Sequence, residues 1–173
     1  MRPPRKSRPA KARGPRPRMI ARVAGLSYGD LDEHLGYVLR RAQLGGFEAF
    51  QRATAGVEIT PPRYTALNIV GANPGMSQSA LGAALGTARS GAMMLADWLE
   101  TRGLAERRRL NGDGRAWGLF LTTGGRSTLA RLKRRVRAED AAFAGRLAQH
   151  ELVELRRLLG KLIEQSRGTG KEG

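Results

Sequence analysis

Cysteine is missing from this 173-residue chain, and histidine occurs only at His34 and His150. Without thiols, the chain forms neither disulfides nor thiolate metal sites, and it does not sense redox state through cysteine. The two histidines lie far apart and lack the spacing of metal ligands, so we expect no metal ion and no cofactor. No apolar run approaches the ~18 residues of a membrane-spanning helix. We see no hydrophobic segment of a secretory signal. We therefore expect a cytoplasmic protein that does not insert into a membrane.

Acidic residues are scarce as well. The chain has 31 Lys and Arg against 15 Asp and Glu, a formal net charge of +16. This excess indicates a polyanionic partner, with nucleic acid first and an anionic membrane surface second. We find no nucleophile–base pairing, metal-ligand spacing or phosphate-binding loop, so the chain is not expected to be an enzyme. A hydrophobic content of 40% is enough for one modest core.

The first 18 residues, MRPPRKSRPAKARGPRPR, hold six Arg, two Lys, five Pro and no acid. This segment cannot build a core, and we expect a disordered basic arm over residues 1–24. Its prolines oppose the amphipathic helix that an organelle presequence needs. Two interpretations remain, an electrostatic arm that touches DNA phosphates and a solvated tail without a specific role.

Helical patterns begin after the arm. Apolar residues recur at helical spacing from Leu31 to about Arg52, and Asp30 or Asp32 is placed to cap this helix. Thr60 precedes two prolines, which predicts that a second helix starts there. The signals then predict a short helix capped by Ser77 and closed by Gly86, a helix over 88–102 ended by Gly103, and strands over 104–109 and 116–122 joined by a turn at 111–114.

Tandem helices followed by a hairpin describe a winged helix-turn-helix, in which the second helix of the turn enters the DNA major groove. The fold class is therefore mainly α with a small β-hairpin wing. In the strand after the turn, Trp117, Leu119 and Leu121 share one face, which is the pattern of a half-buried strand with that face toward the core. Arg115 sits at the hairpin tip, where a wing meets the minor groove. The alternative is an ordinary solvated arginine.

The remainder is predicted to be helical and to form, with the first helix, a dimerisation region from both chain ends. Apolar residues at 129, 132, 136, 143 and 147 share one face, and a heptad-like seam follows. One small winged lobe offers little surface to bury both, which favours a symmetric homodimer over packing within the monomer. The predicted domains are 25–56, an N-terminal dimerisation helix; 57–125, the DNA-binding lobe; and 126–173, C-terminal dimerisation helices with a short tail. The dimer contacts are expected at Leu31, Leu35, Leu152, Leu155, Leu159 and Leu162.

Three stretches, SQSALGAALG, LADWLETRGLAERR and DGRAWGLFLTTGG, occur in the order and helix context of one family. On them, residues 31–166 resemble the MarR family of bacterial transcriptional regulators. The resemblance implies a dimeric winged-helix regulator, most simply a repressor, on double-stranded DNA with a short inverted repeat. It also implies release by a small-molecule effector bound between the dimerisation helices and the DNA-binding lobe. The alternative from charge alone is a non-specific, nucleoid-like nucleic-acid-binding protein.

Within this resemblance, the recognition helix departs from the family where Gly91, Met93 and Met94 replace polar residues. Methionine reads no hydrogen-bond pattern but can contact thymine methyl groups, and one of the two could belong to the core. We therefore expect few base readers, with phosphate contacts and groove shape supplying the rest. Asp113 either orients Arg115 or Arg109, or only turns the loop. The predicted DNA-contacting residues are Gln78, Ser79, Arg89, Ser90, Met93, Met94, Arg109, Asp113 and Arg115.

An effector site is suggested by aromatic and basic residues near the first helix. The set is His34, Tyr37, Arg40, Arg41 and Tyr64, and it suits an aromatic carboxylate or an aryl-CoA thioester. The stretch from Ile59 to Glu100 is similar to the branch of the family associated with aromatic-acid catabolism. The alternative is an ordinary helix surface with a satisfied histidine.

Overall fold

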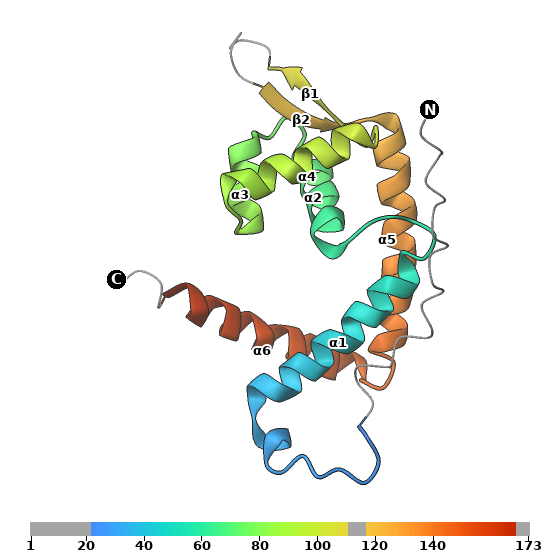
Figure 1. Cartoon of the computed structure of the whole chain (residues 1–173), viewed down its shortest axis with the longest axis vertical. Coiled ribbons are helices and arrows are strands. Elements are labelled where there is room, and N and C mark those ends of the chain that lie inside the picture. Colours follow the sequence, from blue (N-terminus) through green and yellow to red (C-terminus); the bar gives the residue numbers. More distant parts are fainter. Residues whose placement is uncertain (1–21, 111–116, 169–173) are drawn as a thin grey trace, which may run out of the picture. The chain divides into compact units, whose positions relative to one another are not determined.

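The computed structural model describes residues 22–110 and 117–168 (Figure 1). The chain divides into two compact units, residues 1–45 and 46–173, and the boundary lies inside helix α1, Leu35–Ala53. None of the described helices is long and apolar enough to cross a membrane.

In the first unit, the predicted helix begins later than the sequence pattern indicates. Leu31–Glu33 form a single 3-10 turn, and α1 starts only at Leu35. Asp30 occupies the N-cap position of this turn, but its side chain makes no capping hydrogen bond. Its carboxylate lies 3.4 Å from Nε2 of His34, whose extended backbone separates the turn from α1.

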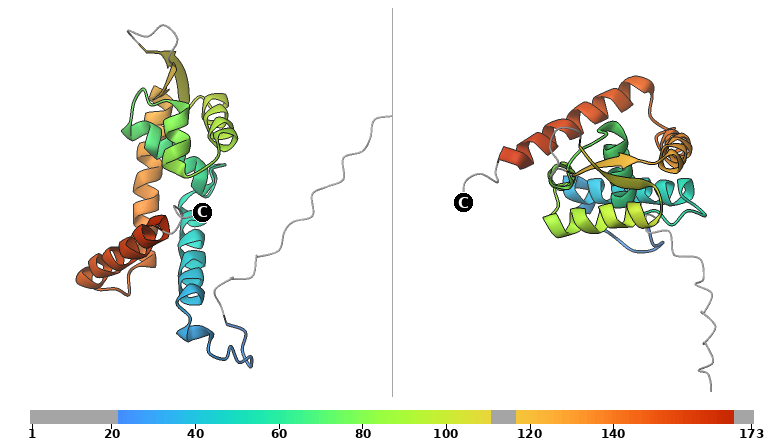
Figure 2. Two further views of the ribbon diagram at one scale, coloured as in Figure 1. Left: turned by 90° about the vertical axis from the view of Figure 1, so that its left-hand side faces the viewer. Right: turned by 90° about the horizontal axis from the view of Figure 1, so that it is seen from above.

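The second unit contains the winged helix-turn-helix, as predicted. Its elements are α2, Pro61–Ala72; α3, Gln78–Leu85; α4, Arg89–Thr101; β1, Ala105–Arg109; β2, Trp117–Leu121; and α5, Thr123–Phe143. We call α2 to β2 the winged lobe (Figure 1 and Figure 2). The apolar core of the second unit is one continuous cluster, to which all the elements from α2 to α5 contribute. Its largest fully buried side chains are Leu67, Val70, Leu81, Leu99, Leu119 and Leu132.

Three helix boundaries, those at Ser77 and Gly86 among the predicted ones, are made by local capping chemistry. The Ser77 hydroxyl accepts a hydrogen bond from the Ala80 amide at 3.1 Å, and Thr122 Oγ1 accepts one from the Gly125 amide at 2.9 Å. Gly86 ends α3 at φ +61°, in the left-handed region that glycine adopts without strain. Thr60 is the N-cap of α2, but its side chain makes no capping bond.

The hairpin pairs Ala105 with Leu121 and Arg109 with Trp117 in antiparallel register. Leu119 and Leu121 are buried as predicted, whereas the prediction for Trp117 is wrong, because its side chain is 52% exposed. Trp117 lies at the end of β2 beyond the apolar core, and the Arg109 guanidinium carbon lies 5.5 Å from its ring centroid. The strands are shorter than predicted, since Leu104 and Thr122 fall outside them.

Helix α6, Gln149–Gly168, carries the predicted dimer seam. Leu152 and Leu159 are half-buried in the single chain, while Leu155 and Leu162 are 41% and 37% exposed. Phe143, on the face of α5 predicted to be apolar, is also exposed. Much of this apolar surface is therefore not covered within one chain.

Candidate nucleic-acid interface

Helix α4 has an anchored face and an exposed face. Ala92, Ala96 and Leu99 are fully buried. Arg89 and Ser90, in its first turn, are exposed. The N-cap residue Ala88 offers no side-chain cap, so the first amide groups of α4 are left for other acceptors, such as a phosphate.

The two methionines of α4 both belong to its exposed face. Met93 is 48% exposed and Met94 is 71% exposed, so neither is part of the core. Gly91 has no side chain with which to read bases. A Cβ at this position would lie 2.5 Å from the hydroxyl oxygen of Thr87, in the turn that precedes α4, so this position favours glycine.

The start of α3 supplies the other predicted contacts of the helix-turn-helix. Gln78 is half-buried and Ser79 is exposed. The side-chain oxygen of Gln78 accepts a hydrogen bond of 3.2 Å from Nη2 of Arg107 in β1. The oxygen of the Gln78 side-chain amide is therefore bonded within the winged lobe.

The three consecutive arginines of β1 have different surroundings. Arg107 pairs with two acidic residues of α4, a position that does not favour phosphate binding. Arg108 pairs with Glu106 and lies 5.3 Å from the centre of the Phe120 ring. Arg109 is exposed, and its guanidinium carbon lies 5.5 Å from the centroid of the Trp117 ring. Asp113 and Arg115 lie outside the described residues, so their roles stay predictions.

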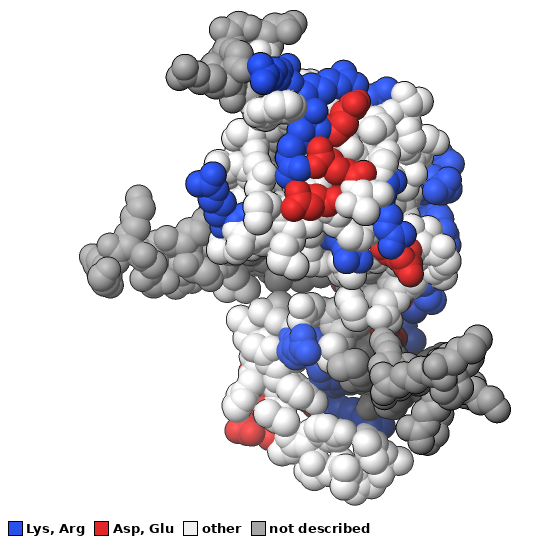
Figure 3. Space-filling view, turned by 45° about the horizontal axis from the view of Figure 1, so that its top comes forward, with Lys and Arg blue, Asp and Glu red and all other residues white. Residues whose placement is uncertain are grey.

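Sequence reasoning missed the acidic residues that surround Arg107. Asp97 and Glu100 are three residues apart and therefore share one face of α4. In the space-filling view, acidic side chains lie beside basic ones in the winged lobe (Figure 3). An acidic pair on the recognition helix of so basic a chain was a signal that could have pointed to an internal partner.

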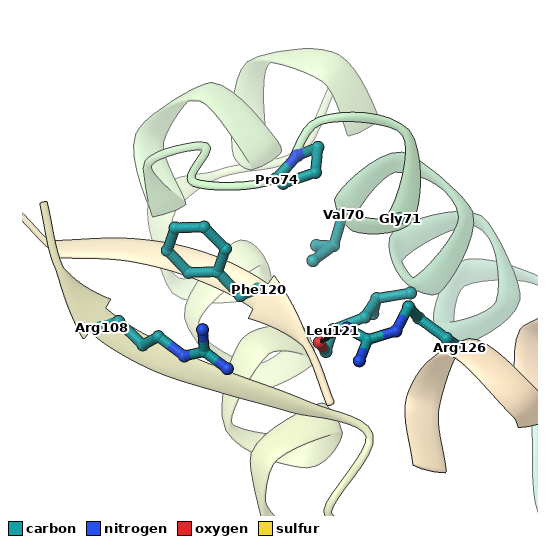
Figure 4. Close-up of a pocket in the computed structure, with 7 residues that line it drawn as sticks. All are labelled: Val70, Gly71, Pro74, Arg108, Phe120, Leu121 and Arg126. Carbon is teal, nitrogen blue, oxygen red and sulfur yellow. Dashed lines mark hydrogen bonds between the residues drawn. The ribbon is translucent and has the colours of Figure 1, made fainter. Parts of the chain in front are cut away.

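A small pocket of about 100 Å³ lies where the end of α2, the hairpin and the start of α5 meet (Figure 4). Arg126 at its edge donates a 2.8 Å hydrogen bond to the Leu121 carbonyl and a 3.0 Å bond to the Thr123 hydroxyl. None of the predicted effector residues lines this pocket. Its lining residues are Val70, Gly71, Pro74, Arg108, Phe120, Leu121 and Arg126.

Four of the predicted effector residues belong to the first unit. His34 lies beside Asp30, and Arg40 donates a 2.7 Å hydrogen bond to the Gln43 side chain. The Arg41 guanidinium carbon lies 5.7 Å from the Tyr37 ring centroid.

Arg41 also lies 3.8 Å from Asp32. A hydrogen bond from Arg22 lowers the pKa of the Asp32 carboxyl, which keeps this acid charged beside the basic residues. In the second unit, Tyr64 packs against the core, with its ring centroid 5.6 Å from that of Phe50. The predicted set is therefore shared between the two units.

Across the described residues there is no group of three or more His, Asp or Glu placed to hold a metal ion. The chemistry available to the winged lobe is therefore that of exposed arginines, helix amides, hydroxyls and methionines. These groups bind phosphates and contact base edges.

Comparison with known proteins agrees with this geometry. A model of the MarR family matches residues 58–116. A transcriptional regulatory protein for the hcr operon of Thauera aromatica is 36% identical over 148 residues, which cover 85% of this chain and 89% of that protein. Such relatives are regulators rather than enzymes, as predicted.

Solved structures show the same relationship. The transcriptional repressor CouR, bound to a 23-mer DNA duplex, is 37% identical with a TM-score of 0.74, and the match covers 80% of this chain and 98% of that one. CouR bound to p-coumaroyl-CoA is 36% identical with a TM-score of 0.70, and the match covers 80% of this chain and 97% of that one. The PcaV regulator of Streptomyces coelicolor, solved in complex with its natural ligand, is 29% identical with a TM-score of 0.70, and the match covers 82% of this chain and 99% of that one. On identity and coverage together, this chain belongs to the MarR family of transcriptional regulators.

Proposed function

We propose that the protein is a ligand-responsive transcriptional regulator, most simply a repressor, that binds an inverted-repeat operator in double-stranded DNA as a homodimer in the cytoplasm. The observation that carries this proposal is the exposed face of α4 beside a hairpin wing, in a chain 37% identical to a repressor bound to a DNA duplex. Two symmetric lobes fit two half-sites about one helical turn apart, ~34 Å.

Direct reading of bases is limited on this surface. The exposed residues in the N-terminal half of α4 offer one guanidinium and one hydroxyl, followed by two methionine side chains. Arginine reads guanine bidentately, while methionine contributes apolar contact with thymine methyl groups. We infer that phosphate contacts by Ser79 and Arg109 and groove shape supply the rest of the affinity. Gln78 contributes an amide contact at the start of α3.

The effector is proposed to be an aromatic acid or its CoA thioester. One relative supports this class, a repressor solved with p-coumaroyl-CoA. His34, Tyr37, Arg40, Arg41 and Tyr64 offer rings and positive charge for such an anion. The effector releases DNA only by its preference for a dimer geometry in which the lobes no longer match the half-sites.

A selection experiment tests the proposal. Duplexes enriched by the protein from a random library should share an inverted repeat, and the enriched duplex should outcompete a scrambled one. Addition of p-coumarate, p-coumaroyl-CoA and free CoA, each in turn, should release DNA with at least one of the aromatic compounds and not with CoA alone. Enrichment of no common sequence would instead support the non-specific, nucleoid-like alternative that the charge of +16 allows.

The wing residue is tested by Arg115→Ala. This change should weaken binding to the selected duplex by at most a few kcal/mol, since one base or phosphate contact contributes roughly 1–3 kcal/mol. The dimer and the helix content should not change. Arg131→Ala, an exposed arginine on α5, serves as the matched control. Equal affinities for Arg115→Ala and the wild type in a gel-shift titration would remove Arg115 from the interface.

A further inference from the structure

Arg107 is the centre of a polar cluster that joins three elements of the winged lobe. Its Nη2 donates to Oδ1 of Asp97 at 2.7 Å and to the Gln78 side-chain oxygen at 3.2 Å. Its Nη1 pairs with Glu100, and its backbone amide donates to the same carboxylate at 2.9 Å. One guanidinium thus connects the start of α3, the C-terminal half of α4 and strand β1.

The charge of this cluster opposes a role in phosphate binding. Two carboxylates surround one guanidinium, so the positive charge of Arg107 is already balanced before DNA arrives. Drawing Arg107 out toward a phosphate would leave Glu100, whose side chain is only 28% exposed, without its cation beside a polyanion. Arg109 is exposed on the same strand, and a phosphate contact by Arg109 would leave no buried carboxylate without its cation.

The apolar packing of α4 does not by itself fix the position of this helix along its axis. Two of the three fully buried residues of α4 are alanines, which interlock with their neighbours less than large side chains do. Leu99, with the half-buried Leu95 and Trp98, packs α4 against the core, whereas the two alanines add little that would fix its position along the axis. The rigid fork of a guanidinium, bonded at several points, defines that position.

We propose that Arg107 is a positioning residue for DNA recognition: together with Glu100 and Asp97 it sets recognition helix α4 against the wing and against α3, and it does not itself bind phosphate. The inference rests on the proposed DNA-binding function. It also assigns the orientation of the Gln78 amide. The oxygen faces Arg107, so the two N–H donors of the NH₂ group point away from it and are available to a DNA phosphate.

Removal of a negative charge gives the decisive test. Glu100→Ala deletes an acid from a DNA-binding lobe and frees Arg107. Electrostatics alone then predicts tighter binding to every duplex. The positioning role predicts the opposite for the duplex selected from a random library, with Kd raised about ten-fold, because bonds to a charged group are lost. Glu106→Ala, in β1 but outside the cluster, is the matched control and should bind no more weakly than the wild type.

Two further variants separate geometry from charge. Arg107→Lys keeps the charge but cannot span three acceptors, so it should not restore the wild-type Kd for the selected duplex. Arg107→Ala should raise that Kd while leaving the slope of log affinity against log salt unchanged. Loss of a true phosphate contact makes that slope shallower by about 0.9. Far-UV circular dichroism verifies that each variant is folded, and Glu100→Ala decides the question if the Arg107 variants are not.

The outcomes are distinct. Weaker binding of Glu100→Ala to the selected duplex, with binding to a scrambled duplex no weaker than that of the wild type, supports the proposal. Tighter binding by Glu100→Ala, full rescue by Arg107→Lys, or a shallower salt slope for Arg107→Ala overturns it and returns Arg107 to the phosphate contacts. If the wild type itself shows no preference for the selected duplex, the proposed function has failed, and the positioning role fails with it.

Discussion

Replacing Leu155 and Leu159 of α6 together by glutamate is expected to abolish the homodimer and, with it, measurable binding to the operator. Leu155 is 41% exposed and Leu159 half-buried in the single chain, on the seam predicted to meet a partner helix. Placing two carboxylates in a desolvated seam costs several kcal/mol, which exceeds what a modest helix pair contributes. Light scattering should report monomer or aggregate in place of dimer.

The control for this pair lies on the same helix. Arg156→Glu with Lys161→Glu introduces the same residue twice at exposed positions outside the seam and should leave the dimer intact. DNA affinity should follow the oligomeric state, since a monomer engages one half-site only. A wild-type protein that is monomeric at micromolar concentration would contradict the dimer prediction directly.

The boundaries of the winged lobe were predictable because short-range chemistry makes them. Ser77 and Thr122 cap their helices through hydroxyl groups, and Gly86 closes α3 in a conformation that glycine favours. Each of these signals involves residues within about one helical turn, and the sequence displays them directly. The order of helices and hairpin, and hence the fold class, followed from them.

Features that depend on neighbours distant in the sequence were less accessible. Alternation placed Trp117 with the buried Leu119 and Leu121, but the core ends before Trp117 is reached. Arg107 is one of three consecutive arginines in β1, and only the packing of β1 against α4 brings it to Asp97 and Glu100. The periodicity and composition of a sequence show which residues share one face of a helix or strand, but not which residues of another element pack against that face.

The candidate site shows the same division. Arg89 and Ser90 are exposed as the sequence predicts, whereas the sequence left open whether one of Met93 and Met94 belongs to the core, and both are exposed. The sequence did not define the effector site, since Tyr64 packs against the core of the second unit while the other predicted residues belong to the first. An effector pocket needs side chains from separate elements, and a linear pattern does not define their distances.

Deleting residues 1–18 is expected to weaken DNA binding strongly at low salt without changing sequence preference. The segment carries six Arg, two Lys and no acid, a charge of +8, and it lies outside the described residues. Each phosphate that it neutralises contributes about −0.9 to the slope of log affinity against log salt. Loss of several such contacts should therefore lower the affinity about ten-fold or more at low salt and make the slope visibly shallower.

The ratio of affinities for operator and scrambled duplex should survive this deletion, because base reading belongs to α4 and the wing, while phosphate contacts are the same in every sequence. Both duplexes should be titrated at several salt concentrations with the full chain and with the shortened one. A matched variant with the eight basic residues of the arm replaced by glutamine keeps its length and tests charge alone. An unchanged slope would make the arm a bystander. A collapsed ratio with an unchanged slope would mean that the arm reads sequence, and specificity would then not reside in α4 and the wing alone.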